Sequence, residues 1–547
     1  MKNLGLILIQ CLFIFQSFAQ SRYLSEVFPD VKVSSDVVYG RNATIFTKPL
    51  LGHLTPVDLK MDVYEPIGDT LQERPLVLVI HDGNFFPQVL NGSIIGSKTD
   101  SSVVEICTQL AKRGFTAAAI TYRQGWNPLG VSQLDRVTTM IQALYRGVQD
   151  GRTAIRFFRK NYNEEDNEFH IDPNRITVWG NGTGAFVALN MVAISHINDF
   201  ALTTNGPGKF LFDSDNDGVP DTPMVLEEIH GDIEGKNLTI APYDFLGITE
   251  GDTTNYANHL NYSSEFHLSV NISGSVADIG WMNDNSIPTI SIQSIFDLYY
   301  PYNEFSFVVH PGTLYFQTQG SELIGELQEN LGNNQAWKDG IKEDEIYTKE
   351  ANWHSAIAGH PYYEGVYPVI NSANSNGIHE GVVIDWWDPN SPSPIDGPGL
   401  GLPWNEVPSS SGLSMHDLEL IRNENMSAEK ARANIDTIMN YFAPRACITL
   451  ELSDCHSDIF TSSAEEQLDD SSIKIFPNPS NGLLTINASE KTLELIQVFD
   501  LDGRLVKSLS QIHGTEKEID LSDLVKGIYL IKIQLNDAIV VRKIMLN

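Results

Sequence analysis

A short glycine-rich run in the middle of the chain marks the first place where chemistry is expected. Residues 175–185 read Arg-Ile-Thr-Val-Trp-Gly-Asn-Gly-Thr-Gly-Ala, which predicts a β-branched strand, a tight turn and a helix. In G-x-S-x-G sequences this context presents a serine nucleophile on a strained turn. Gly182 stands where that serine would be, between two framing glycines. Because glycine has no side chain to attack a carbonyl, the pattern predicts a nucleophile position that has lost its nucleophile.

Two other segments hold groups that would assist such a nucleophile. Gly83 and Asn84 follow the apolar run 76–80, and their backbone N–H groups, with that of Thr183, are predicted to face a developing oxyanion. Asp297 follows an expected strand and precedes a proline turn, a place that suits a carboxylate orienting an imidazole. Thr183 is not expected to replace the serine, because one step along a helix start rotates a side chain by about 100°.

The histidine of this set has two candidates. His379 lies in a loop rich in glycine and asparagine, after the strand expected at 366–370. His416 lies nearer to the last expected helix and is its rival. We take His379 as the predicted ancestral base. His354 and His360, in an aromatic-rich insertion, are predicted to pack or to lie at the surface.

An acidic loop carries a second, independent motif. Asp213, Asp215, Asp217 and Asp221 occupy positions one, three, five and nine around a glycine that permits a sharp turn. Alternating oxygen ligands of this kind hold calcium in protein loops. The E-terminated EF-hand pattern is not met, and the sequence is closer to the D-x-D-x-D-G-x-x-D loops of thrombospondin-type repeats. We predict a structural Ca²⁺ site, with a solvated acidic turn as the alternative.

The elements that must position these groups alternate between strands and helices. Residues 58–64 alternate in polarity, and a buried strand at 76–80, a helix at 101–113, a strand at 116–122, a helical stretch at 131–162 and a strand at 176–178 follow. Later strands are expected at 268–272, 289–292 and 366–370, and a closing helix at 427–442. Such alternation predicts a mostly parallel sheet with helices on both faces. With nucleophile position, acid and histidine in that chain order, it predicts an α/β-hydrolase fold over residues 20–458.

The end of the chain differs in composition. Residues 459–472 are polar and acidic and predict a linker with too little apolar surface to fold. Residues 473–547 contain short β runs at 483–486, 495–499 and 528–533, separated by Asn-Gly and Asp-Gly turns. This pattern predicts a small all-β sandwich of immunoglobulin type.

The N-terminus indicates the cellular compartment, and the net charge restricts the classes of partner. Residues 1–19 have one positive charge, a short apolar run and small residues before the expected cleavage site, which predicts a signal peptide rather than a transmembrane segment. The 36 basic and 70 acidic residues give a formal net charge of −34, which disfavours nucleic acid and anionic membrane surfaces as partners. Cys107, Cys447 and Cys455 remain after cleavage, so one disulfide with three possible pairings is expected.

Two resemblances add to these predictions. Residues 80–86, 96–101, 113–115, 121–125, 145–157 and 171–176 resemble secreted carboxylesterase- or lipase-like α/β-hydrolases of Bacteroidota. In that family the elbow typically reads G-x-S-A-G-A, so the nucleophile role passes to no side chain here, and the H-G-T-x-D acid element is reduced to residues 293–297. Residues 475–482, 498–504, 527–529 and the ending 542–546 resemble a type IX secretion sorting domain. That resemblance implies passage to the periplasm, export by the type IX machinery and a final place at the cell surface or outside the cell.

These observations leave two main hypotheses for function. The first is a secreted, catalytically impaired pseudo-hydrolase that binds an ester-like or glycan ligand, or a protein partner, through the old pocket and the aromatic segment 347–404. The second is an active carboxylic-ester hydrolase that uses a non-standard nucleophile or water activated by a pair of His379 and Asp297. General-base catalysis without a covalent intermediate contributes roughly 10²–10⁴-fold, so weak activity is compatible with the second. A third hypothesis, a purely structural surface protein, predicts neither ligand binding nor turnover.

Overall fold

The computed structural model describes residues 21–546, except 92–94, 205, 284–285, 307–315, 372, 385–411, 414–416, 418–419, 422, 456–472, 490, 500–504, 510–511, 513 and 536–538. The expected signal peptide, residues 1–19, and the whole of the expected linker, residues 459–472, therefore lie outside the described residues.

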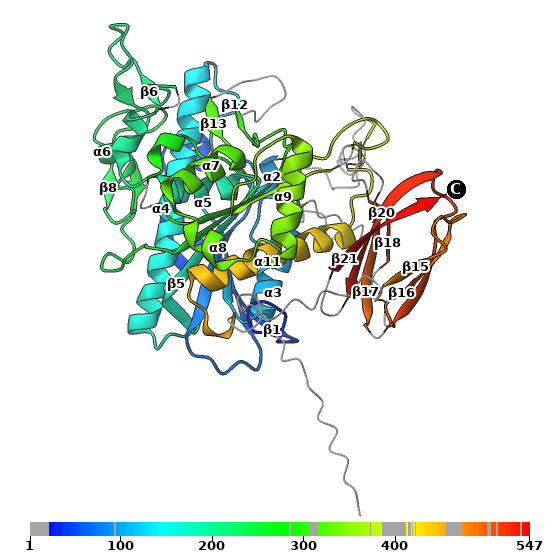
Figure 1. Ribbon diagram of the computed structural model, residues 1–547. Coiled ribbons are helices and arrows are strands. Elements are labelled where there is room, and N and C mark those ends of the chain that lie inside the picture. Colours follow the sequence, from blue (N-terminus) through cyan, green and yellow to red (C-terminus); the bar gives the residue numbers. More distant parts are fainter. Residues whose placement is uncertain are drawn as a thin grey trace, which may run out of the picture.

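A mixed eight-stranded sheet forms the centre of the larger domain (Figure 1). Its strands are β1 (Val31–Thr44), β2 (Thr55–Pro66), β3 (Arg74–Ile80), β4 (Thr116–Ile120), β5 (Ile171–Asn181), β10 (Leu268–Ile272), β11 (Thr289–Ser294) and β14 (Val366–Val369). They lie in the order β1-β2-β4-β3-β5-β10-β11-β14. The first two are antiparallel to their neighbours, and all the others pair in parallel. The predicted mostly parallel sheet is confirmed, whereas β1 was not predicted.

Helices cover both faces of this sheet, as the alternation predicts. One apolar core lies between the sheet and the helices α4 (Gln133–Glu164), α5 (Thr183–Ala193) and α7 (Ser321–Leu331). The core on the other face involves α3 (Ser101–Lys112), α8 (Gln335–Gly340), α9 (Ile346–Ala358) and α11 (Ala428–Thr449). The central strand β3 serves both: Leu76 and Leu78 belong to the first core, and Val77 and Val79 to the second. A strand buried on both faces reads as a continuous apolar run, which is why this one was visible in the sequence.

Helix α11 extends past the predicted end at residue 442. It continues to Thr449 with Pro444 inside it. Packing holds this last part, because Ala446 and Cys447 are buried in the second core and the buried guanidinium of Arg445 donates to the carbonyl of Tyr441 at 2.9 Å. Tertiary contacts here outweigh the helix-breaking tendency of proline.

Shorter elements connect this frame. They are α1 (Lys48–Leu51), α2 (Gln88–Asn91), a 3₁₀ turn at Ile197–Ala201, β6 (Leu211–Phe212), β7 (Thr222–Pro223), α6 (Glu227–His230), β8 (Thr239–Ile240), β9 (Thr253–Asn255), further 3₁₀ turns at Ile279–Trp281 and Ser453–Cys455, β12 (Glu304–Ser306) and β13 (Gln317–Gln319). Several of them form an excursion between α5 and β10 that has its own small apolar cluster around Ile229 and Phe245.

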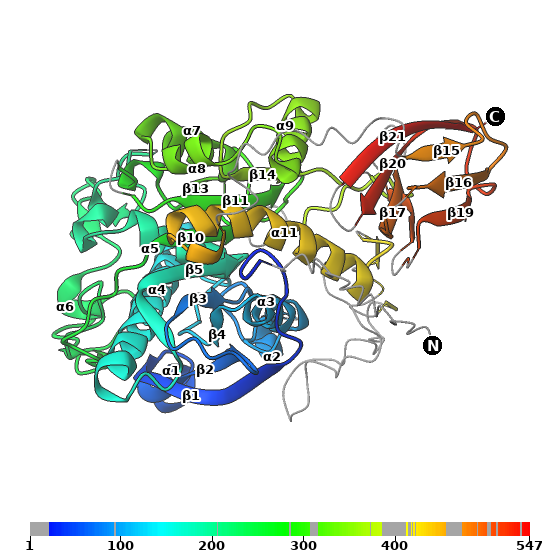
Figure 2. The same cartoon turned by 60° about the horizontal axis from the view of Figure 1, so that its bottom comes forward.

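The C-terminal residues form a separate all-β module (Figure 2). Its strands are β15 (Lys474–Phe476), β16 (Leu483–Asn487), β17 (Leu493–Phe499), β18 (Leu505–Leu509), β19 (Glu516–Asp520), β20 (Gly527–Leu535) and β21 (Ile539–Leu546). One sheet has the order β15-β16-β19 and the other β18-β17-β20-β21, both antiparallel. Alternate residues of both sheets, such as Leu484, Ile496 and Ile531, form one core. The predicted β-sandwich is confirmed.

The cysteines and the hydropathy of the helices complete the description. Cys447 and Cys455 form a disulfide, and Cys107 is a buried free thiol, so one of the three open pairings is observed. Within the described ranges, none of the helices is long and apolar enough to span a membrane.

Candidate active site

The glycine turn at Gly182 has the geometry of a nucleophile elbow. Gly182 lies between β5 and α5 with φ 52° and ψ −117°, a conformation that residues with a side chain adopt only under strain. The framing glycines are needed for packing: a Cβ on Gly180 would lie 2.2 Å from the carbonyl oxygen of Gly184, and a Cβ on Gly184 would lie 2.1 Å from that of Ile80. The elbow backbone is therefore intact although its central side chain is missing.

The carboxylate of Asp82, which follows β3, fills the space that the missing side chain leaves. An ideal Cβ on Gly182 would lie 2.0 Å from Oδ2 of Asp82. The other oxygen, Oδ1, accepts hydrogen bonds from the backbone N–H of Gly83 at 2.7 Å and from that of Thr183 at 2.9 Å. The Thr183 hydroxyl donates to the same oxygen at 2.9 Å. Two of the predicted oxyanion donors thus converge on one atom, and that atom belongs to the protein.

Asp82 is the residue that the sequence analysis missed. Asp82 belongs to the loop after the apolar run 76–80, which we call the oxyanion loop because the backbone N–H groups of Gly83 and Asn84 were expected to face an oxyanion. The sequence analysis considered only these backbone groups. A carboxylate next to Gly83, in a loop that is expected to bind negative charge, was the one available signal.

The oxyanion loop is fixed by contacts on both sides of Asp82. A Cβ on Gly83 would lie 2.5 Å from Cα of Gly96, so the loop needs glycine there. Asn84 has φ 54°, and its carbonyl accepts a hydrogen bond from the indole N–H of Trp126 at 2.9 Å. The structure therefore brings Gly83 and Thr183 to the carboxylate, while the contact recorded for Asn84 anchors the loop to the segment after β4.

The buried residues Tyr122 and His81 lie next to the elbow. The Tyr122 hydroxyl lies 3.3 Å from the hydroxyl of Thr183 and donates to the carbonyl of His81 at 3.2 Å. The His81 ring is buried and bonded to the carbonyl of Asp82, and desolvation lowers its pKa to about 4. The imidazole is therefore neutral at physiological pH. The hydroxyl of Thr183, engaged with Asp82, is one member of a closed hydrogen-bonded group.

The acid candidate lies in the turn after β11. The Asp297 carboxylate accepts from the backbone N–H groups of Tyr299 at 2.9 Å and Tyr300 at 3.0 Å. Desolvation raises the pKa of Asp297 to about 7, and the charge of Asp82 contributes in the same direction; the backbone N–H groups and the hydroxyl of Ser273 oppose it. Asp297 is thus a half-buried carboxyl that titrates near neutral pH.

The histidine candidate lies beside the acid turn without meeting its carboxylate. The exposed His379 ring stacks on Phe296 at a centroid distance of 3.8 Å and an interplanar angle of 20°. Its Nδ1 is 2.9 Å from the carbonyl oxygen of Asn371. Among the described residues, no histidine ring is hydrogen-bonded to Asp297. The rival, His416, lies outside the described residues, so the identity of the ancestral base stays a prediction.

The other two histidines have local partners. Nδ1 of His354 is 2.8 Å from the carbonyl oxygen of Pro368, and Nδ1 of His360 is 2.8 Å from the Glu322 carboxylate. Both rings are half-buried.

The acidic loop brings three of its four predicted ligands together. One carboxylate oxygen each of Asp213, Asp215 and Asp217 lies within 4.8 Å of the others. Asp221 is not part of this group, and its Oδ1 accepts from the hydroxyl of Thr222. The β6–β7 hairpin closes the loop. The calcium site stays a prediction.

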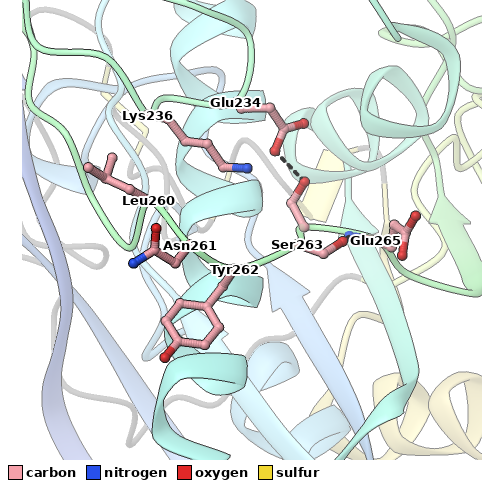
Figure 3. A pocket seen from close by; sticks show the side chains of 8 residues that line it. Glu234, Lys236, Leu260, Asn261, Tyr262, Ser263 and Glu265 are labelled. Carbon is pink, nitrogen blue, oxygen red and sulfur yellow. Dashed lines mark hydrogen bonds between the residues drawn. The ribbon is translucent and has the colours of Figure 1, made fainter. Parts of the chain in front are cut away.

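A hollow in the surface has a volume of about 440 Å³ (Figure 3). Its lining residues are Glu234, Lys236, Leu260, Asn261, Tyr262, Ser263, Ser264 and Glu265. None of them belongs to the elbow, the oxyanion loop or the acid turn. The Glu234 carboxylate forms ion pairs with Arg152 and Arg156 of α4 and accepts a hydrogen bond from the Ser264 hydroxyl. These contacts explain the polar lining residues Glu234 and Ser264 without a ligand.

The fold and the elbow together define an α/β-hydrolase, and comparison with known proteins extends this. Residues 61–210 match the family model BD-FAE, and residues 474–547 match the Secretion system C-terminal sorting domain. The chain is thus an esterase-like α/β-hydrolase with a type IX sorting tail, which directs it to the cell surface or the extracellular space. The two resemblances expected from the sequence are confirmed.

Esterases are among the solved structures that are similar to the chain. A truncated carbohydrate esterase from gut microbiota is 16% identical, covers 50% of this chain and 79% of its own, and gives a TM-score of 0.27. Esterase 2 of the planctomycete Thermogutta terrifontis, in its native form, is 16% identical, covers 50% and 74%, and gives 0.25. The same enzyme phosphorylated by paraoxon is 18% identical, with the same coverage and TM-score. No curated protein matches the chain significantly.

The position of Asp82 predicts an unusual cost for a side chain at the elbow. Gly182→Ala should lower the free energy of unfolding by more than the about 1–3 kcal/mol that a strained backbone conformation costs, because the new Cβ also overlaps the Asp82 carboxylate. The matched control is Gly359→Ala, since Gly359 has φ 74° but open space around it. Urea unfolding of the two variants compares the costs. Equal losses would contradict the overlap.

The raised pKa of Asp297 predicts a pH-dependent effect of neutralising it. The folded protein keeps a proton on this carboxyl up to about pH 7, whereas the ordinary value is 3.8, so its contribution to stability is lost as pH rises from about 4 to about 7. Asp297→Asn removes the charge and keeps an oxygen for both N–H donors. The variant should therefore melt at a higher temperature than the unmodified protein at pH 8.5, with little difference at pH 4.5. A constant difference between the two pH values would refute the shift.

The calcium prediction is tested by chelation. A bound ion stabilises the folded state, so EDTA should lower the melting temperature of the full chain and added Ca²⁺ should restore it. Asp215→Asn should abolish this response, whereas Asp221→Asn should leave part of it, because Asp221 stands outside the cluster. A melting temperature that is insensitive to EDTA would contradict the calcium site and favour the alternative, a solvated acidic turn.

Proposed function

We propose that the esterase-like domain is a pseudo-hydrolase: a secreted hydrolase-fold protein that does not form an acyl-enzyme and acts by binding. The observation that carries the proposal is the elbow, whose strand, turn and helix are preserved around a residue without a side chain. A serine hydrolase depends on a covalent intermediate at this position, so the loss of the side chain removes the central step of its mechanism.

The neighbouring hydroxyl does not replace the missing one. Thr183 is buried, and its hydroxyl donates to the Asp82 carboxylate. An activated nucleophile needs a general base that accepts its proton and is itself held by an acid. The described partners of the Thr183 hydroxyl are the Asp82 carboxylate and the Tyr122 hydroxyl, neither of which is an imidazole. The described contacts of the His379 ring are with a backbone carbonyl and the Phe296 ring. These contacts support a site in which the triad is not assembled.

The binding role then falls to the surfaces around the former catalytic centre. We propose an ester-like or glycan ligand, or a protein partner, at the old pocket and the segment 347–404, of which residues 347–371 and 373–384 are described. Trp353 in α9 is about half exposed, as suits a residue that stacks on sugar rings or packs against a partner. Export to the cell surface or the medium makes extracellular glycans and proteins accessible as ligands.

One observation favours a second candidate, an active ester hydrolase. Asp297 titrates near neutral pH, and a carboxyl with such a pKa is suited to general-base work on a water molecule. The ceiling of that mechanism, roughly 10²–10⁴-fold, is far below the acceleration by a serine esterase.

An esterase assay separates the two candidates. The full chain should hydrolyse p-nitrophenyl acetate no faster than its Asp297→Ala and Thr183→Val variants, because neither residue performs a chemical step in a pseudo-hydrolase. A Ser-directed phosphonate should leave the protein unlabelled. Turnover that is lost in Asp297→Ala would favour general-base hydrolysis, and turnover that is lost in Thr183→Val would identify a hydroxyl nucleophile. Either result would overturn the proposal.

A further inference from the structure

We infer that the Asp82 carboxylate is a built-in occupant of the oxyanion hole, and that the hole becomes a binding site for small carboxylates when this side chain is removed. The inference rests on the proposed function and deepens it: in the native protein the place of an ester carbonyl oxygen is already taken.

The donor geometry carries this inference. Three hydrogen-bond donors point at one oxygen: the N–H of Gly83, the N–H of Thr183 and the hydroxyl of Thr183, at 2.7, 2.9 and 2.9 Å. They come from two separate elements, the loop after β3 and the first residue of α5. Donors in oxyanion holes lie about 2.7–3.1 Å from the oxygen that they stabilise. Oδ1 of Asp82 therefore sits where the oxyanion of a tetrahedral intermediate would sit.

The electrostatics also favour a carboxylate in this place. The Thr183 N–H opens the 11-residue helix α5, and the first N–H groups of a helix have no acceptor within the helix. Together with the helix dipole they form a site for negative charge. An unsatisfied donor in a buried site is costly, and the Asp82 carboxylate satisfies these donors without a substrate.

The second carboxylate oxygen explains why Asp82 and Gly182 belong together. Oδ2 lies 2.0 Å from the ideal Cβ position of Gly182, so any side chain on that residue competes with Asp82 for the same volume. The glycine admits the carboxylate, and the carboxylate closes both the oxyanion hole and the nucleophile position. An ester carbonyl consequently finds the donors of Gly83 and Thr183 occupied, and the native ligand must be recognised by other contacts.

A consequence concerns attempts to restore catalysis. Gly182→Ser alone places the new side chain against the carboxylate, so a functional elbow also requires that Asp82 be shortened. The two substitutions should therefore interact strongly in a double-mutant cycle, although their residues are 100 positions apart in the sequence (182 − 82).

The direct test is chemical rescue of Asp82→Ala by acetate. Melting temperatures of the full chain are compared in 0.2 M sodium acetate and 0.2 M sodium chloride at pH 8. Asp82→Ala should melt lower than the unmodified protein in chloride and should gain about 2 °C in acetate, as expected for occupancy at roughly tenfold the Kd. The unmodified protein should not respond. The matched control is Asp82→Asn, which keeps an acceptor oxygen in the hole and should not respond either. An acetate effect of the same size in all three proteins, or in none, would overturn the inference.

The double-mutant cycle is a second test that does not depend on acetate binding. Gly182→Ser should lower the melting temperature markedly in the unmodified background and much less in Asp82→Gly. Additive effects would overturn the inference. These readouts do not depend on turnover, so they are separate from the esterase assay. Ester hydrolysis by the unmodified protein would remove the pseudo-hydrolase proposal, while rescue confined to Asp82→Ala would still place Asp82 in the hole.

Discussion

The hydrogen bonds of the Asp82 carboxylate to Gly83 and Thr183 are the interactions on which the interpretation of this site depends. They join the end of β3 to the start of α5, next to the point where Gly184 leaves no room for a Cβ against the carbonyl of Ile80. A hydrolase keeps this junction empty, so that substrate oxygen can enter. In the arrangement that we propose, the protein supplies this oxygen itself through Asp82, and the site is closed without a change of the framework.

The framework of the fold and the chemistry of a nucleophile have different physical requirements. The strand order, the positive φ at the elbow and the two framing glycines are fixed by backbone packing, which is costly to change because cores are close-packed. The nucleophile is a single side chain, and its loss frees space instead of leaving a strained core. This explains how an esterase-like domain can keep its architecture around Gly182, and why fold alone does not establish activity.

Sequence reasoning anticipated the strands and turns around Gly182 and Asp297 but not the side-chain contacts there. The elbow at Gly182, the donors Gly83 and Thr183 and the turn with Asp297 were placed from strand patterns and glycine positions, because these features are local. The edge strand β1 was not predicted, since its exposed, polar stretches lack the apolar run that marked β3. The contact of Asp82 with the elbow was also not predicted, because it depends on a side-chain rotamer across two strands. His379 was placed near Asp297 by chain order, but its ring direction is set by Phe296 and Asn371.

The sequence by itself determined that the chain has an α/β-hydrolase frame, a glycine at the predicted nucleophile position and a sorting tail. Each of these features depends on one continuous segment of the sequence, through its periodicity, its motif or a residue that has no side chain. Only the tertiary structure decided that the Asp82 carboxylate lies beside Gly182, that Cys447 and Cys455 form a disulfide, and that the described contacts of His379 are with Asn371 and Phe296. The physical reason is that hydrogen bonds and excluded volume act between atoms that are close in space, and in the folded chain those atoms come from segments far apart in the sequence.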